Sequence, residues 1–368
     1  MERGVVVIYS TETRGQHEHE SVTQADVASR LARLKGYKFA GEYEPAAGYT
    51  GPVYFVPSDT VVGTEAAFGL GIRTEHDLFG GVVPYAFAAT KAITHTLVDP
   101  DAHAPEGWSA DFGRQIREAV LTGFAVFTLD DARRALGRLL DNGPARVKLA
   151  RGIGGRGQRV VTEANEVETV LLAIDPVELS RYGIVLEEEL AEVTTYSVGQ
   201  VRVADLLATY YGTQRSTTNN SGAKVYGGSA LVVVRGDFDE LLKLSLGQDI
   251  RLAIAQARAY DAAAVEHFPG FFASRRNYDV ARGVDASARW RSGVLEQSWR
   301  LGGASGAEVA ALEAFRADAS LHAVRASSIE TYGACDPPPQ AMVHFHGVDD
   351  HVGPITKYVL VEPYVDPR

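Results

Sequence analysis

The chain has 368 residues, of which 45% are hydrophobic and 23% charged, a composition typical of a soluble globular protein with two or three lobes. Its formal net charge of −11 argues against a general nucleic-acid binder, so we expect no nucleic-acid partner. The single cysteine, Cys335, excludes an intrachain disulfide, and no apolar run reaches the roughly 20 residues of a membrane span, so we expect a cytoplasmic protein without a membrane partner.

The first part of the chain alternates between strand and helix patterns. The apolar run Val5–Tyr9 predicts a buried parallel strand. Residues 23–34 carry a helical apolar stripe, residues 53–56 form a second short apolar run, and a further helix is expected over Thr64–Leu70. Strand, helix and strand at this spacing predict an open α/β lobe over residues 1–90.

A second, smaller α/β lobe is predicted over residues 115–186. Residues 86–97, which precede it, have a helical pattern that contains Lys91. Thr128 can cap a helix over residues 130–140, because Asp131 follows three residues later and an apolar stripe comes after it.

The stretch 145–161 combines a strand, a glycine-rich loop and a second strand. Lys148 projects from the polar face of the first strand, and the loop contains two arginines, Arg151 and Arg156, and four glycines, Gly152, Gly154, Gly155 and Gly157. A dinucleotide-binding loop would continue into a helix and a Walker loop would end in Gly-Lys-Ser/Thr, and neither follows here. The pattern indicates a flap that closes over a nucleoside triphosphate, the alternative being an ordinary glycine-rich hairpin.

Acidic and polar segments follow. Three consecutive glutamates, Glu187, Glu188 and Glu189, come directly after the apolar run 184–186, where they form either a solvated turn or a hinge between lobes. Strands are expected over residues 198–208 and 230–234. The polar stretch 215–228 between them is a surface excursion or a substrate loop. A long helix is expected over residues 246–268.

Residues 274–281 and 293–301 both alternate and predict a hairpin. Period-2 geometry places Asn277 and Asp279 on one face of the first strand and Glu296, Ser298 and Arg300 on one face of the second. Such a pair of carboxylates suits a hard divalent cation, whereas the alternative is a cross-strand ion pair with Arg300.

The order of these features resembles that of the ATP-grasp superfamily, which includes biotin carboxylase, D-alanine–D-alanine ligase and glutathione synthetase. The features are Lys91, Lys148 with its glycine loop, the acidic run, Asp279, and the Glu296-x-Ser298-x-Arg300 pattern. The chain also resembles bacterial ATP-grasp-like proteins of uncharacterised function. The resemblance implies an α/β (α+β) ATP-grasp fold. A pre-ATP-grasp lobe would occupy residues 1–90, the central lobe residues 115–186, and the C-terminal lobe residues 187–368.

The resemblance also implies a role for individual residues. ATP would be held by Lys91, Lys148, the flap residues Arg151, Gly154, Gly155, Arg156 and Gly157, and the hinge residues Glu187, Glu188 and Leu190. Mg²⁺ would be held by Asp279, Glu296 and Ser298, although the family has an asparagine where this chain has Ser298. Lys148 and Arg300 would stabilise charge on the transferred phosphoryl group, and Arg275 or Arg276 would bind a substrate carboxylate unless they are ordinary surface arginines.

The implied activity is that of a ligase that uses ATP and Mg²⁺ to join a small carboxylate to an amine or similar nucleophile through an acyl phosphate. A small-molecule kinase and a degenerate ATP-binding scaffold are the alternatives, and Ser298 favours the scaffold. Substrate choice is assigned to residues 215–228 and 344–351, and the resemblance also admits a homodimer. His344 and His346, with Asp349, Asp350 and His351, form either a metal site or a structural or substrate-contacting segment.

Overall fold

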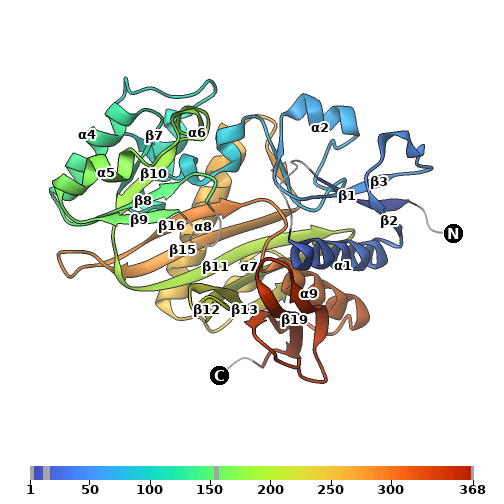
Figure 1. The fold of residues 1–368 in the computed structure, drawn as a ribbon. Coiled ribbons are helices and arrows are strands. Elements are labelled where there is room, and N and C mark those ends of the chain that lie inside the picture. The colour runs from blue at the N-terminus through green and yellow to red at the C-terminus, as the bar shows by residue number, and fades with distance from the viewer. Residues whose placement is uncertain (1–3, 11–16, 153–156, 366–368) are drawn as a thin grey trace.

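The N-terminal lobe of the computed structural model, which describes residues 4–10, 17–152 and 157–365, is built on two small sheets (Figure 1). The first is parallel with the order β2-β1-β3, and helix α1 (Glu18–Lys35) packs on it. The second has the order β14-β5-β4, and helix α2 (Thr64–Leu70) lies beside it. The strands are β1 (Val5–Tyr9), β2 (Lys38–Glu42), β3 (Val53–Pro57), β4 (Val61–Val62), β5 (Gly81–Val83) and β14 (Phe272–Ala273).

The link to the next lobe differs from the prediction of one helix over residues 86–97. It consists of two 3₁₀ turns, Ala86–Ala89 and Lys91–Thr94, and the short strand β6 (Thr96–Leu97). Thr90 separates the two turns because its backbone is extended and its hydroxyl accepts a hydrogen bond from the Ala92 N–H. A threonine in this role caps the second turn instead of continuing the first.

The central lobe is a five-stranded sheet in the order β6-β7-β10-β8-β9. Thr128 caps α4 as predicted, accepting a hydrogen bond from the Asp131 N–H. Apolar side chains of α4, α5 and α6 join those of the sheet in one core, and α3 lies outside it. The bounds are β7 (Gly123–Val126), β8 (Ala145–Leu149), β9 (Gln158–Val161), β10 (Ile184–Glu188), α3 (Ala110–Gln115), α4 (Leu129–Leu140), α5 (Val167–Leu171) and α6 (Pro176–Tyr182).

The C-terminal lobe is an eight-stranded antiparallel sheet in the order β16-β15-β11-β12-β13-β17-β19-β18. Helix α8 packs on β11, β15 and β16, and α9 packs on β12, β13, β17 and β19. The strands are β11 (Ala191–Val203), β12 (Leu206–Thr218), β13 (Lys224–Arg235), β15 (Arg275–Val284), β16 (Trp290–Ser298), β17 (Ala323–Tyr332), β18 (Met342–Asp349) and β19 (Gly353–Pro363). The helices are α7 (Phe238–Leu242), α8 (Gln248–His267) and α9 (Ser305–Ala317).

Two predictions for this lobe are corrected. The expected strand 198–208 is split between β11 and β12 by a turn in which Ala204 has a positive φ of 53°. The expected excursion 215–228 is the outer part of the β12–β13 hairpin, which stays paired as far as Thr218 and Lys224. The β-branched and aromatic residues in that stretch favour a strand in spite of its polar composition.

The N-terminal lobe is docked on the C-terminal lobe through a shared apolar core. Leu31 of α1, Val233 of β13 and Phe315 of α9 belong to the same buried cluster, and α1 and α9 lie side by side (Figure 1). The helices and sheets of the three lobes confirm the predicted mixed α/β class. Of the helices in the described part of the chain, none has the length and apolar character needed to cross a bilayer.

Candidate functional site

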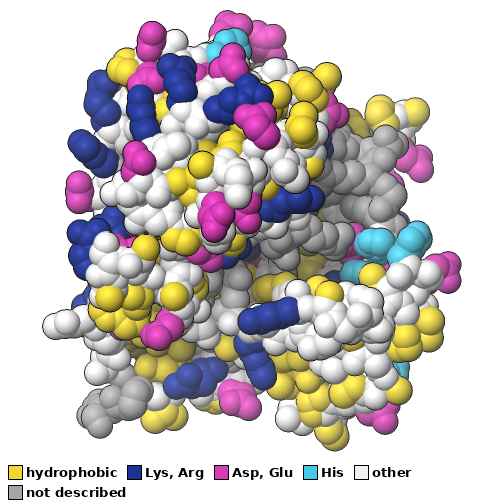
Figure 2. Space-filling view, turned by 60° about the vertical axis from the view of Figure 1, so that its left-hand side comes forward, with side chains coloured by type: hydrophobic (Ala, Val, Ile, Leu, Met, Phe, Trp, Pro, Cys, Tyr) yellow, Lys and Arg dark blue, Asp and Glu magenta, His cyan; other side chains and the backbone are white. Residues whose placement is uncertain are grey.

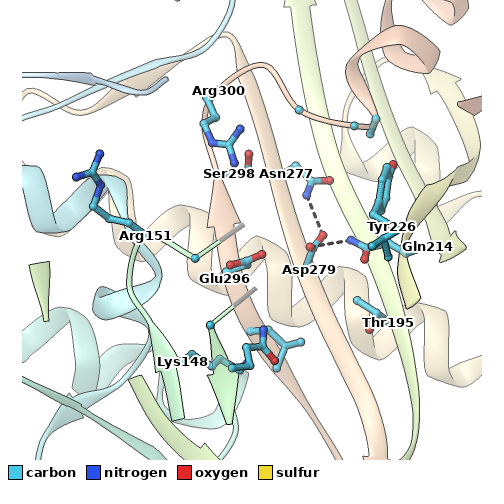
Figure 3. Close-up of a pocket in the computed structure, with 18 of the residues that line it drawn as sticks. Lys148, Arg151, Thr195, Gln214, Tyr226, Asn277, Asp279, Glu296, Ser298 and Arg300 are labelled. Carbon is cyan, nitrogen blue, oxygen red and sulfur yellow. Dashed lines mark hydrogen bonds between the residues drawn. The ribbon is translucent and has the colours of Figure 1, made fainter. Parts of the chain in front are cut away.

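A cleft of about 1750 Å³ lies where the three lobes meet. It receives Asp59 from the N-terminal lobe, Lys148 from the central lobe, and Asp279, Glu296 and further side chains from the C-terminal sheet. Single-ligand pockets usually measure about 300–1,000 Å³, so this cleft has room for more than one small ligand. In Figure 3, the two carboxylates point into one space with Lys148 to one side.

The two carboxylates come from directly paired positions, as the alternating pattern predicted. Asp279 on β15 lies opposite Glu296 on β16, next to a register shift. Asp279 accepts hydrogen bonds from Gln214 Nε2 (2.7 Å), Asn277 Nδ2 (3.0 Å) and Ser197 Oγ (3.2 Å). Burial, followed by repulsion from Glu296, raises the pKa of Asp279 to about 6 in spite of these donors. Two carboxylates held together in this way favour a cation between them.

Lys91 supplies one positive charge beside this pair. Its Nζ lies 2.5 Å from Glu296 Oε2 and donates to the Gly152 carbonyl oxygen at 2.9 Å. The side chain is buried, and it starts from the 3₁₀ turn that replaces the predicted helix. Lys91 therefore links the loop after β8 to one of the two carboxylates.

Lys148 supplies the second positive charge, and it is ion-paired with Glu187 on the adjacent strand β10. Their side chains are only 5% and 3% exposed, and His95 Nε2 lies 3.2 Å from the same carboxylate. Burial alone raises the pKa of Glu187, but the Lys148 ammonium and His95 outweigh it and lower the pKa to about 2. Glu187, one of the residues predicted to hold ATP, is thus the counter-ion of Lys148, which is predicted to hold ATP as well.

The glycine-rich loop is described at its two ends. At one end, Gly152 donates its N–H to the Leu149 carbonyl, and at the other end Gly157, with a φ of 73°, precedes β9. The Arg151 guanidinium lies over the Tyr182 ring at 4.7 Å, and both residues line the cleft. The remaining predicted flap residues, Gly154, Gly155 and Arg156, lie outside the described residues.

The side chains of the three consecutive glutamates, 187–189, do not all point the same way, because successive side chains along a strand alternate. Glu188 points away from the cleft, where it accepts the Thr122 N–H at 2.9 Å and pairs with Arg291 at 3.2 Å. Glu189 and Leu190 line the cleft, and Glu189 is ion-paired with Arg146. The structure therefore does not bring the predicted nucleotide contact Glu188 to the site.

The arginines predicted to bind substrate are each paired with a carboxylate of the protein, although Arg275 lines the cleft. Arg275 is 1% exposed and forms an ion pair with Glu308 of α9 at 2.9 Å, and it also donates to the Arg300 carbonyl. Arg276 projects from the opposite face of β15 and pairs with Asp261 of α8 at 2.9 Å. The predicted clamp on a substrate carboxylate therefore has neither guanidinium available, because α9 and α8 supply carboxylates that the sequence pattern did not reveal.

Ser298 ends β16 and Arg300 lies two residues beyond it, and both line the cleft. Arg300 lies 3.5 Å from Asp59 of the N-terminal lobe, with its side chain partly exposed. Ser298 Oγ accepts a hydrogen bond from Arg275 Nη1 at 3.1 Å, and a hydroxyl bound to a guanidinium is a poor ligand for Mg²⁺.

The family's asparagine is replaced by Ser298 on β16, but an asparagine side chain, Asn277, is present on the neighbouring strand β15. Asn277 lies directly opposite Ser298 and lines the cleft. Its amide nitrogen donates to Asp279, and its amide oxygen accepts from Tyr210 Oη at 3.0 Å. Sequence reasoning put Asn277 on the correct face but gave it no role. The cross-strand register was the signal that could have found it.

Comparisons with known proteins now identify the family. The chain belongs to the family described as "Protein of unknown function (DUF3182)". Its model matches residues 6–359. No curated protein matches the sequence.

Solved structures resemble the chain over almost its whole length. The N5-carboxyaminoimidazole synthetase of Staphylococcus aureus has a TM-score of 0.50 and 11% identity, over 99% of this chain and 95% of that one. An ADP complex of the N5-carboxyaminoimidazole ribonucleotide synthetase purK has a TM-score of 0.49 and 12% identity, over 99% of this chain and 94% of that one. Biotin carboxylase of Campylobacter jejuni has a TM-score of 0.49 and 11% identity, over 98% of this chain and 87% of that one. The Staphylococcus aureus match confirms the predicted ATP-grasp fold, and identity this low carries the fold alone.

Proposed function

We propose that this chain is an ATP-grasp ligase that uses ATP and Mg²⁺ to join a small carboxylate to an amine or a similar nucleophile. The observation that carries the proposal is the meeting of buried Lys148 and two paired carboxylates in one cleft between lobes, with a second buried lysine, Lys91, ion-paired to one of those carboxylates. In this proposal residues 1–90 are the pre-ATP-grasp lobe, residues 115–186 the central lobe and residues 187–368 the C-terminal lobe.

The proposed roles follow from charge and position. Lys148 and Lys91 bind ATP phosphates after release from Glu187 and Glu296, and Arg300 neutralises charge on the transferred phosphoryl group. Ordered positioning of this kind supplies most of the rate in phosphoryl transfer, which asks little covalent chemistry of the protein.

Mg²⁺ fits the residues present at the floor of the cleft. Asp279 and Glu296 offer hard oxygen ligands whose mutual repulsion a cation would relieve. Asn277 orients the Asp279 carboxylate through its amide nitrogen, whereas the Ser298 hydroxyl is bound to Arg275. Bound there, Mg²⁺ would neutralise phosphate charge.

Calorimetry tests the nucleotide part of the proposal. ATP with Mg²⁺ should bind the wild type, and Lys148→Ala should abolish that binding, whereas the exposed control Lys243→Ala should leave it unchanged. Affinity for ATP should also fall when Mg²⁺ is omitted. A wild-type chain that binds no nucleotide would contradict the proposal.

Turnover tests the reaction class. Amino acids and small carboxylates, alone and in pairs, are screened for release of ADP and phosphate. Phosphate release that needs both a carboxylate and an amine supports the ligase. ADP formation with a stable phosphorylated product supports a kinase instead, and tight ATP binding without turnover supports a scaffold. The Arg275–Ser298 hydrogen bond is the observation that favours the scaffold, because it occupies the side chain that stands in the metal motif.

A further inference from the structure

A second group of potential ligands lies where the start of α1 meets the turn between β18 and β19. His17, Asp349 and His351 each offer one ligand atom, and these atoms lie within 4.8 Å of one another. His17 and His351 line the cleft, and the Asp349 side chain is fully buried behind them. Figure 2 shows histidine side chains gathered at one side of the face that it presents. More than 300 residues of sequence separate the two halves of this group.

The Asp349 carboxylate is fixed in place by backbone donors. It accepts the N–H groups of His351 at 2.9 Å, of Val352 at 3.1 Å and of His19 at 3.1 Å. The bond from His19 ties the first turn of α1 to the end of β18. Among the described residues, Asp349 has no lysine or arginine partner, and its ion-pair contact is His351 Nδ1 at 4.0 Å. Buried carboxylates are normally paired with a cation or bound to a metal, so this group has room for a further positive charge.

The His17 imidazole is also incompletely satisfied. Its Nδ1 is buried and has no hydrogen-bond partner in the described part of the chain. The ring lies edge-on to His351, with centroids 4.8 Å apart, and stacks on His19 at 5.6 Å. A buried imidazole nitrogen without a partner destabilises the folded chain, and a bound metal would relieve that cost.

We propose that His17, Asp349 and His351 bind a divalent transition metal of the zinc class. Two imidazoles and one carboxylate suit Zn²⁺ better than Mg²⁺ or Ca²⁺, which prefer oxygen ligands. Tetrahedral ligands about 2.0–2.1 Å from zinc lie about 3.3 Å apart, so the spacings between the present ligand atoms must shorten by at most about 1.5 Å. His351 can supply this movement, because its side chain is 70% exposed. The backbone donors on Asp349 are the outer shell that keeps a metal-bound carboxylate oriented.

Three protein ligands leave a fourth position open to the cleft, as in catalytic rather than structural zinc sites. This site is distinct from the Asp279–Glu296 pair in its ligand chemistry and in the elements that form it. The proposal therefore does not depend on ATP binding, and it fails or succeeds separately from the ligase assignment.

The test is metal binding by the untagged full-length chain, stripped of metal and free of nucleotide. Titration with Zn²⁺ should give one equivalent, and Co²⁺ in its place should give the intense visible absorption of a tetrahedral site. His351→Ala should weaken binding at least about tenfold, since losing even an outer-shell partner typically costs that much. Because His351 is exposed, this variant should fold normally. Asp349→Asn should weaken binding in the same way.

Two matched controls accompany these variants. Asp350→Asn changes the exposed neighbour of Asp349, and His76→Ala removes an exposed histidine of the same lobe as His17, so both should bind Zn²⁺ like the wild type. Glu296→Gln should also keep zinc binding. A wild type that binds neither Zn²⁺ nor Co²⁺, His351→Ala binding as tightly as the wild type, or loss of zinc in Glu296→Gln would each overturn the proposal.

Discussion

Replacing Asp279 by asparagine should remove a specific pH dependence from the stability of the chain. The pKa of Asp279 is raised from 3.8 to about 6 by burial and then by Glu296. The folded state therefore binds more protons than the unfolded state between about pH 4 and pH 6, so stability falls as the pH rises through that window. Above about pH 6 the full penalty is present, and below about pH 4 it is absent.

The size of the effect follows from the two pKa values. A rise from 3.8 to about 6 corresponds to about 3 kcal/mol, and this is an upper bound because Asp279 faces a cleft that admits water. Relative to the wild type, Asp279→Asn should gain up to about 2 kcal/mol of unfolding free energy between about pH 4.5 and about pH 7.5, because about 1 kcal/mol of the penalty is already present at about pH 4.5. Mg²⁺ should stabilise the wild type at the higher pH and leave the variant unchanged.

Urea denaturation at both pH values, with and without Mg²⁺, measures these differences. The comparison between wild type and variant cancels the other groups that titrate in the same range. Asp350→Asn is the control, because it makes the same chemical change at an exposed position. A stability difference between wild type and Asp279→Asn that is the same at both pH values would refute this account of the paired carboxylates.

Three further substitutions test neighbouring contacts. Lys148→Ala should cost about 3–5 kcal/mol in urea denaturation, because Glu187 loses its buried ammonium; adding Glu187→Gln should restore stability but not ATP binding measured by calorimetry. Asn277→Ala should weaken Mg²⁺ binding in the same assay more than Ser298→Ala does, because Asn277 orients the Asp279 carboxylate, and the reverse order would restore the serine as ligand. Arg275→Met should destabilise the chain by about 3–5 kcal/mol without changing the KM for any carboxylate, whereas a selective rise in KM would make Arg275 a substrate ligand.

Local patterns in the sequence were sufficient for much of the fold. The apolar run of β1, the stripe of α4 after the Thr128 cap, and the alternation of β15 and β16 each depend on neighbouring residues, and the structure has all of them. The same alternation placed Asp279 and Glu296 on one face, and the register confirms that they are opposite each other. The order of motifs supplied the ATP-grasp fold, which the match to a solved structure confirms.

The errors arose where a distant element decides the outcome. Arg275 and Arg276 are adjacent in sequence, but α9 pairs one with Glu308 and α8 pairs the other with Asp261. The strand pattern predicts that consecutive side chains point to opposite faces of the sheet, but it does not identify the carboxylates that other elements bring to those faces. The proposed metal-ligand group was found only in part for a similar reason: the sequence indicated Asp349 and His351 as possible ligands, but His17 comes from the start of the first helix, far from them in sequence.

In the proposed function, the ion pairs at the cleft favour binding of nucleotide and Mg²⁺ together over binding of either one alone. ATP alone would draw Lys91 and Lys148 towards its phosphates and leave the carboxylates of Glu296 and Glu187 without their main counter-ions in a buried setting. Mg²⁺ alone would bind Glu296 and leave the ammonium of Lys91 unpaired. When both bind, the phosphates take over the lysines and the cation takes over Glu296, so each of these charges finds a new partner. Glu187 keeps His95, 3.2 Å away, as its remaining contact when Lys148 moves to the phosphates.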